Sequence, residues 1–187
     1  MTSMDLDLTG RCALVTGAGK GIGRSICLSL AKAGANIFAV SRTESDLETL
    51  GQDLTSLEIN YSFCVTDLRD KATAEYIADR AVKDIGVPDV LVNNAGVGIN
   101  ALAIEVTEEQ WDTTLDINVK GAFFLSQVVG KNMLKTGWGR IINVSSQAGL
   151  VGLEQHAVYG ASKGAMNMMT KVLAVEWGSR GVTINAI

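Results

Sequence analysis

Short apolar runs rich in β-branched residues alternate with longer amphipathic segments along this chain of 187 residues. Because a strand, a helix and a second strand form a right-handed βαβ unit, this alternation predicts a parallel sheet covered by helices on both faces. The expected strands cover 12–16, 36–41, 61–65, 90–93, 140–145 and 182–187. The expected helices cover about 24–34, 43–52, 71–84, 107–133 and 158–177. We therefore predict one doubly wound α/β domain over residues 1–187.

The last expected strand reaches the final residue, Ile187, and no helix follows it. Domains of this class seldom stop at such a point. We therefore expect the sequence to be a fragment or a truncated isoform, apparently ending after the sixth strand.

Composition excludes several classes of function. Hydrophobic residues make up 47% of the chain, which indicates a globular protein, and a net charge of −4 without a basic run argues against a nucleic-acid surface. The three cysteines, Cys12, Cys27 and Cys64, are widely spaced in apolar contexts, which favours buried free thiols in a reducing compartment. With His156 as the only histidine, we expect no metal site.

Nothing in the sequence resembles a membrane or export signal. The first ten residues are acidic and lack an apolar core, so they are not expected to be a signal peptide. No apolar run reaches the length of a membrane span. Cytoplasmic localisation is the resulting expectation.

A glycine-rich turn joins the first strand to the first helix. Gly17, Gly21 and Gly23 are spaced G-x-x-x-G-x-G in the stretch VTGAGKGIGRS. Glycines there permit a tight turn and close approach of the backbone to a pyrophosphate, which the N–H groups of the helix N-terminus then attract. This position in a βαβ series predicts a dinucleotide-binding Rossmann fold.

The end of the second strand indicates which dinucleotide is bound. NAD sites usually carry an acid there for the ribose 2′-hydroxyl, whereas this chain has Ser41, Arg42 and Thr43. Lys20 adds a second cation inside the glycine loop. Cations at both places suit a 2′-phosphate, so we expect NADP(H) as cofactor and, as the less favoured alternative, NAD(H).

Several motifs in order give the chain a clear resemblance to the single-domain branch of the short-chain dehydrogenase/reductase family. They are TGAGKGIG (16–23, which includes Ile22), Asp67 in VTDL, NNAG (93–96, which includes Asn94 and Gly96), Asn118 in LDINVKG, Ser146 in INVSS, and Tyr159 with Lys163 in YGASK. The resemblance implies that Asp67 caps the adenine pocket and that Asn94 and Gly96 lie at the cofactor. It also implies that a last strand and most of a substrate loop are missing.

The tyrosine and the lysine stand four residues apart, and therefore on the same helical face. Reduction of a ketone requires a proton donor near neutral pH, and a nearby ammonium helps a phenol to exchange its proton. Tyr159 and Lys163 are thus the candidate acid/base and its partner, and Lys163 could also reach ribose hydroxyls. By resemblance, Ser146 binds the substrate carbonyl oxygen, and Asn118 holds a water that links Lys163 to solvent.

Three further residues have competing interpretations. Ser145 is the alternative to Ser146, which the family's spacing to the tyrosine favours. Asn93 is expected to tie strands together. His156 could face substrate, but we favour an exposed position before the last helix.

The leading prediction is an NADP(H)-dependent oxidoreductase that interconverts a carbonyl group and an alcohol. The glycine loop and VSRT resemble the carbonyl-reductase and L-xylulose-reductase branch, although oxoacyl, polyol or gluconate substrates also fit. The alternative is a truncated cofactor-binding or interaction module without turnover. The resemblance also implies a homo-oligomer, a dimer or tetramer, that pairs through the helices beginning near Thr107 and Val158.

Overall fold

The computed structural model describes residues 6–187. Residues 1–5 lie outside the described residues. The expectation that the first ten residues are not a signal peptide falls partly on this segment. The strands are β1 (Cys12–Thr16), β2 (Asn36–Ser41), β3 (Tyr61–Val65), β4 (Val90–Asn93), β5 (Gly139–Asn143) and β6 (Val182–Ala186). The longer helices are α1 (Gly21–Lys32), α2 (Glu44–Leu54), α3 (Lys71–Ile85), α4 (Glu108–Leu115), α5 (Ala122–Thr136) and α6 (Ala157–Trp177).

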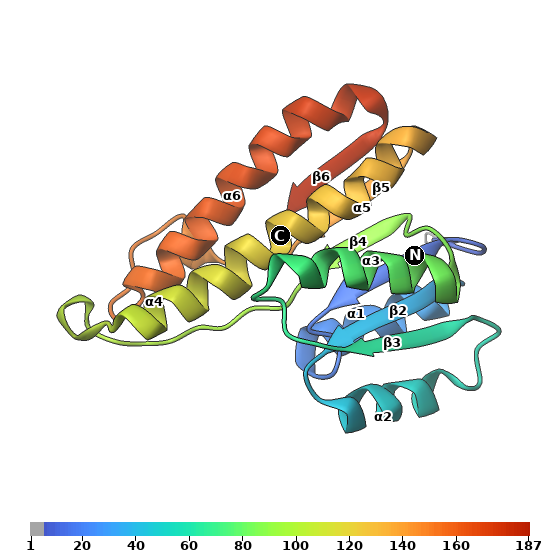
Figure 1. The fold of residues 1–187 in the computed structure, drawn as a ribbon, viewed down its shortest axis with the longest axis horizontal. Coiled ribbons are helices and arrows are strands. Elements are labelled where there is room, and N and C mark those ends of the chain that lie inside the picture. The colour runs from blue at the N-terminus through green and yellow to red at the C-terminus, as the bar shows by residue number, and fades with distance from the viewer. Residues whose placement is uncertain (1–5) are drawn as a thin grey trace, which may run out of the picture.

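All six strands form one parallel sheet in the order β3-β2-β1-β4-β5-β6, which confirms the predicted doubly wound fold. The chain winds outward from β1 to β3 and then returns to β4 on the other side of β1 (Figure 1). Ligands of such sheets bind in the crevice at the carboxyl ends of the strands, where the order reverses. The glycine turn and the motif after β4 both lie at this edge.

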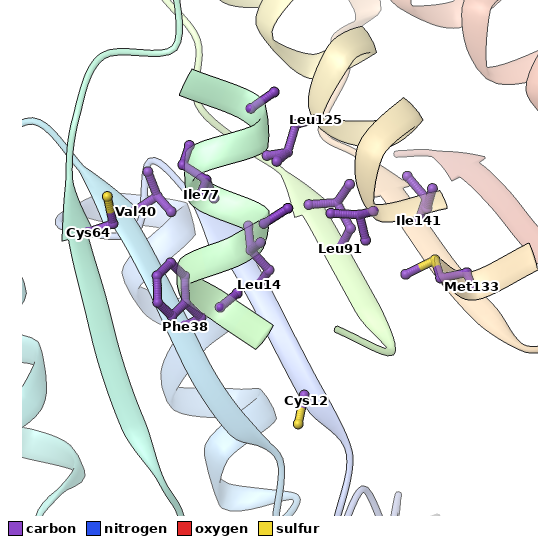
Figure 2. Close-up of a cluster of buried hydrophobic side chains, with 14 of the residues drawn as sticks. Cys12, Leu14, Phe38, Val40, Cys64, Ile77, Leu91, Leu125, Met133 and Ile141 are labelled. Atoms are coloured by element: carbon purple, nitrogen blue, oxygen red, sulfur yellow. The ribbon is translucent and has the colours of Figure 1, made fainter. Parts of the chain in front are cut away.

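Two hydrophobic clusters hold helices to the two faces of the sheet. On one face, Leu14, Phe38 and Leu91 pack against Ile77 of α3 and Leu125 of α5, and all five are fully buried (Figure 2). The second cluster joins the opposite side chains of β1 and β2 to α1 and α2. Near-continuous burial of β1, β2 and β4 is what a parallel sheet between two helical layers requires.

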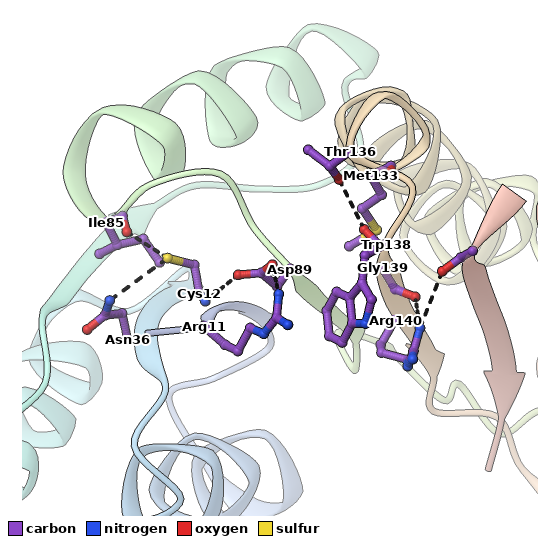
Figure 3. Close-up of polar contacts among 11 residues, drawn as sticks. Arg11, Cys12, Asn36, Ile85, Asp89, Met133, Thr136, Trp138, Gly139 and Arg140 are labelled. Carbon is purple, nitrogen blue, oxygen red and sulfur yellow. Dashed lines mark hydrogen bonds and ion pairs between the residues drawn. The ribbon is translucent and has the colours of Figure 1, made fainter. Parts of the chain in front are cut away.

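A separate set of contacts ties β1 to β5 at the amino ends of the strands, away from the crevice (Figure 3). The guanidinium carbons of Arg11 and Arg140 lie 4.0 and 4.4 Å from the ring centroid of Trp138. Asp89 accepts hydrogen bonds from Arg11 Nη1 and from the Cys12 backbone N–H, both at 2.9 Å. These cation–π and ionic contacts serve the fold and not the crevice.

The helix predicted over 107–133 is interrupted. It begins as expected at Thr107, which forms a capping box with Gln110, but α4 ends at Leu115 and a π-helical turn, η2 (Asp116–Gly121), precedes α5. Gly121 packs so closely on Leu68 that a Cβ there would lie 2.7 Å from the Leu68 carbonyl oxygen. This tertiary contact is invisible in the local sequence pattern.

The other differences concern the ends of elements. The helix α1 begins at Gly21 and includes two of the glycines, whereas β5 ends at Asn143, two residues before the predicted end. Parallel pairing still continues past β5, because the Val144 N–H donates to the Asn93 carbonyl oxygen at 2.9 Å. Among the described residues, no helix has both the length and the hydropathy needed to span a membrane.

Candidate active site

A cavity of about 280 Å³ opens at the carboxyl ends of β1 to β4. Of the residues predicted to bind the cofactor, its lining contains Gly17, Lys20, Ser41, Arg42, Asp67 and Gly96. The turns after four different strands therefore converge on one hollow, as the parallel topology requires.

The glycine turn forms a cradle that larger side chains would fill. Gly17 and Gly21 have φ values of +64° and +51°, which favour glycine. A Cβ at Gly23 would collide with the Gly17 carbonyl oxygen. Lys20 is the residue just before α1, and its side chain has no oxygen that could accept a capping hydrogen bond. The first N–H groups of α1 are therefore left available for a ligand. A bare loop at a helix N-terminus fits a pyrophosphate.

Asn94 stabilises the backbone of this loop but does not line the cavity. Its Nδ2 donates to the carbonyl oxygens of Thr16 at 3.0 Å and Gly17 at 3.2 Å. The structure thus brings Asn94 to the predicted cofactor site as a clamp on the backbone. Ile22, in contrast, is 64% exposed and faces a different, shallow depression along α1.

Gly19 is a residue that the sequence analysis missed. It lines the cavity, and a Cβ there would lie 2.9 Å from both Ser41 Oγ and Asp46 Cβ. The sequence signal that could have identified Gly19 as a cofactor-site residue is its position between Gly17 and Gly21 in the glycine-rich turn.

The rim of the cavity near β2 and β3 carries opposite charges. The Arg42 side chain forms no ion pair within the described part of the chain, whereas Lys20 Nζ lies 3.3 Å from Asp46 Oδ2. Asp67 accepts hydrogen bonds from the backbone N–H and Nε of Arg69, at 3.1 and 3.0 Å. Partial burial acts to raise the pKa of Asp67, but these bonds and the charges of Arg69 and Arg42 outweigh it and lower the pKa.

The tyrosine and the lysine of α6 lie on one face of the helix, as predicted from their spacing. Lys163 Nζ is 5.7 Å from the ring centroid of Tyr159 and donates to the Val144 carbonyl oxygen at 2.7 Å. The Lys163 side chain is buried, and burial lowers the pKa of its ammonium group. The ring of Tyr159 packs on the loop after β4, next to Gly98.

Asn118 joins this group through the π-helical turn. Its Oδ1 accepts from the Val97 N–H at 2.8 Å, and its Nδ2 donates to the Val97 carbonyl oxygen at 2.9 Å and to Ser162 Oγ at 3.0 Å. A Cβ at Gly96 would lie 3.2 Å from Asn118 Oδ1 and 3.7 Å from Lys163 Nζ. Gly96 therefore lies between the cavity and the catalytic candidates.

The two serines after β5 have different surroundings. Ser145 Oγ donates to Asn167 Oδ1 of α6 at 2.6 Å. Within residues 6–187, Ser146 Oγ has a single hydrogen bond, which it accepts from the Ala148 N–H at 3.1 Å. Asn167 Nδ2 also donates to the Gly149 carbonyl oxygen at 3.4 Å. Asn167, which the sequence analysis did not select, thus holds the segment on both sides of Ser146.

Two side chains with alternative interpretations have clear positions. Asn93 Nδ2 donates to Ser126 Oγ at 2.9 Å and to Asn143 Oδ1 at 2.8 Å, so Asn93 ties β4 to α5 and β5. His156 is half-buried, and its ring lies 6.0 Å from that of Tyr159 in an edge-on arrangement. His156 lies just before α6, as expected, but the expected exposure is wrong, because the residue is half-buried and bridges to Ala101.

A glycine cradle beside a tyrosine–lysine pair, at the reversal point of a parallel sheet, defines a dinucleotide-binding oxidoreductase. Comparison with known proteins agrees: the profile of the short chain dehydrogenase family matches residues 11–187. The L-xylulose reductase of Mesocricetus auratus is 44% identical over 98% of this chain and 72% of its own length.

Two solved structures have the same fold. One, described as an NAD(P)-dependent gluconate 5-dehydrogenase from Beutenbergia cavernae with NADP bound at low occupancy, has a TM-score of 0.91 and 38% identity over 97% of this chain and 72% of its own. An NAD⁺-bound xylitol dehydrogenase has a TM-score of 0.91 and 32% identity over 95% and 69%. The chain belongs to the short-chain dehydrogenase/reductase family, which confirms the predicted resemblance, and it is an oxidoreductase that acts on CH–OH groups.

Proposed function

We propose that this protein is an NADP(H)-dependent oxidoreductase that interconverts a small ketose or related carbonyl compound and the corresponding polyol. The observation that carries the proposal is the placement of Lys163 beside Gly96, which lines the cavity, and of Tyr159 beside Gly98 on the same loop after β4. The bound nicotinamide would supply or accept the hydride.

Tyr159 is the proposed acid/base. In reduction, its hydroxyl donates a proton to the carbonyl oxygen as that oxygen becomes an alkoxide, and in oxidation it takes the proton back. Ser146 Oγ, whose only hydrogen bond within the described residues comes from the Ala148 N–H, would donate to the same oxygen and stabilise its charge.

Lys163 and Asn118 support the proton transfer. The Lys163 Nζ lies 5.7 Å from the centroid of the Tyr159 ring. Burial lowers the pKa of the Lys163 ammonium, which makes exchange of its own proton easier. Both amide N–H donors of Asn118 are used by Val97 and Ser162. The family resemblance implies a water that links Lys163 to solvent. Asn118 could bind that water only by accepting a hydrogen bond from it.

The preference for NADP(H) rests on this chain's own residues, because the two solved relatives hold different dinucleotides. Gly17, Gly21 and Gly23 would hold the pyrophosphate with Asn94 as their support, whereas Lys20 would add its charge to the site of the 2′-phosphate. Arg42 and Ser41 line the cavity where the second strand ends, and no carboxylate follows that strand directly. These groups suit a ribose 2′-phosphate, while Asp67 would cap the adenine.

The substrate class is inferred from the relatives and from the site's surroundings. The relatives described above are named for L-xylulose, gluconate and xylitol. A second cavity, of about 350 Å³, lies between residues 148–153 and the start of α6, and His156 lines it. The volume of this cavity suits a small substrate.

The direct test measures binding and turnover separately. NADPH and NADH affinities are obtained by fluorescence titration, and NADPH oxidation is followed with a panel of ketoses of four to six carbons. We expect tighter binding of NADPH and ketose-dependent oxidation. Binding without turnover on any ketose would instead favour the alternative, a cofactor-binding module.

We also propose a homo-oligomer that pairs through α4 and α6. On α6, Val175 is 83% exposed and Met168 is 58% exposed, and Trp111 of α4 is half-exposed. Burial of such side chains against a second copy is favourable. Light scattering should give a dimer or tetramer, and Val175→Glu should lower its mass; a monomeric wild type would contradict the proposal.

Residues 1–187 are proposed to form a single dinucleotide-binding domain, with its cavity and catalytic candidates on one sheet. The three cysteines are free and buried, which supports a reducing, cytoplasmic location. Fractionation of cells that express the tagged protein would test the location.

A further inference from the structure

An ion pair stands at the point of the cavity where the 2′-phosphate is proposed to bind. Lys20 Nζ lies 3.3 Å from Asp46 Oδ2, and the Lys20 side chain is 77% exposed, whereas that of Asp46 is 24% exposed. Asp46 Oδ2 itself is buried and has no hydrogen-bond partner in the described part of the chain, so the contact is ionic without hydrogen-bond geometry. Lys20 is the only cation that pairs with this carboxylate among residues 6–187.

Asp46 shares its surroundings with the proposed phosphate ligands. Gly19 separates Asp46 Cβ from Ser41 Oγ, since a Cβ on Gly19 would lie 2.9 Å from both atoms. Asp46 belongs to the first turn of α2, three residues after Thr43, which lines the cavity. The positive end of that helix attracts the carboxylate, and it would attract a phosphate equally.

From these contacts we infer that Asp46 is a specificity-determining residue. Its carboxylate holds Lys20 as an internal counter-ion and thereby lowers the affinity for NADPH relative to NADH. This inference rests on the proposed function. A 2′-phosphate at Ser41 and Arg42 meets the field of a partly buried carboxylate, and it must draw Lys20 away from Asp46 to gain its charge.

The opposite role, in which Asp46 orients Lys20 toward the phosphate, is weaker on physical grounds. Exposed ion pairs fix a lysine only weakly, and Lys20 is largely exposed. Repulsion between a carboxylate and a dianion at short range is larger, because the buried oxygen of Asp46 is poorly screened by salt. The net effect of the Asp46 charge is therefore to weaken NADPH binding.

The first experiment compares Asp46→Asn with the wild type by titration with NADPH and NADH at low ionic strength. Asp46→Asn should tighten NADPH binding roughly tenfold and leave NADH binding within about twofold, because NADH lacks the phosphate. Glu48→Gln removes a charge from the same helix at an exposed position and serves as the matched control. An unchanged or smaller ratio of NADPH to NADH affinity in Asp46→Asn overturns the inference.

The second experiment places Lys20→Gln in both backgrounds. In the wild type it should weaken NADPH binding by no more than about twofold, because Asp46 already neutralises Lys20, and in Asp46→Asn it should weaken binding roughly tenfold. Equal losses in the two backgrounds would overturn the counter-ion role.

Failure of the proposed function gives a different pattern. If the wild type binds NADH as tightly as NADPH, the proposed cofactor preference is wrong, while a shift of the ratio in Asp46→Asn would still support the inference. If the wild type binds neither dinucleotide, both are wrong. If it prefers NADPH and Asp46→Asn leaves the ratio unchanged, only the inference is wrong.

Discussion

The proposed cofactor cleft and the proposed catalytic group lie at the same edge of one sheet, but different parts of the chain build them. Missing side chains shape the cleft: Gly17, Gly19 and Gly23 leave room that a Cβ would close. Polar side chains build the catalytic group, where Asn118 and Lys163 bond to the backbone at Val97 and Val144.

This difference separates two kinds of vulnerability. A substitution in the cradle adds atoms to a closely packed backbone and should affect folding and cofactor binding together. A substitution in the catalytic group removes a functional atom from a site that other contacts still support, so turnover should fall while binding persists.

Tyr159→Phe should have the largest effect and would separate the two regions most cleanly. Removing the phenol oxygen removes the proposed proton donor, and turnover should fall by roughly 10²–10⁴-fold. NADPH affinity, measured by fluorescence titration, should stay near the wild-type value. Tyr76→Phe, on the exposed side of α3, is the control; loss of both binding and turnover would point to a structural role for Tyr159.

Arg42→Asp tests the charge of the cleft. A carboxylate at the end of β2 repels a 2′-phosphate and can bind a ribose hydroxyl, so the ratio of NADPH to NADH affinity should fall roughly 100-fold. The same charge change at exposed Arg180, after α6, should leave the ratio unaltered. An unaffected ratio in Arg42→Asp would refute the assigned cofactor preference.

Gly23→Ala tests whether the cradle is shaped by missing atoms. Its Cβ would collide with the Gly17 carbonyl oxygen and the Asn94 amide, so the free energy of unfolding should fall by about 1–3 kcal/mol and dinucleotide binding should weaken. Urea denaturation measures the first effect and titration the second. Gly178→Ala has open space around its Cβ and should change neither; equal behaviour of the two variants would exclude the packing argument.

Lys163→Met should have the smallest effect of the four substitutions, and it should appear in how the free energy of unfolding depends on pH. Burial lowers the pKa of Lys163 below its ordinary value of 10.5, so the unfolded chain binds more protons between the folded pKa and 10.5. The contribution of Lys163 to stability therefore rises with pH across that window. Urea denaturation as a function of pH should show a shallower rise in Lys163→Met than in wild type, and Lys135→Met, an exposed control, should keep the full rise.

The sequence alone predicted the fold class, the bounds of most strands and the family. These features depend on local patterns. Neighbouring residues alone determine the apolar runs, the glycine turn and the helix start at Thr107. The Tyr159–Lys163 pair was predictable for the same reason, because a spacing of four residues determines a shared face once the helix forms.

Only the tertiary structure decided how distant residues meet. Within the π-helical turn, Gly121 packs closely against Leu68, and Asn118 bonds to the backbone of Val97. The sequence places Lys20 as a cation in the glycine loop, and only the fold brings Asp46 of α2 to its ammonium group. Such contacts join residues far apart in sequence, and local periodicity carries no information about which side chains will share a space.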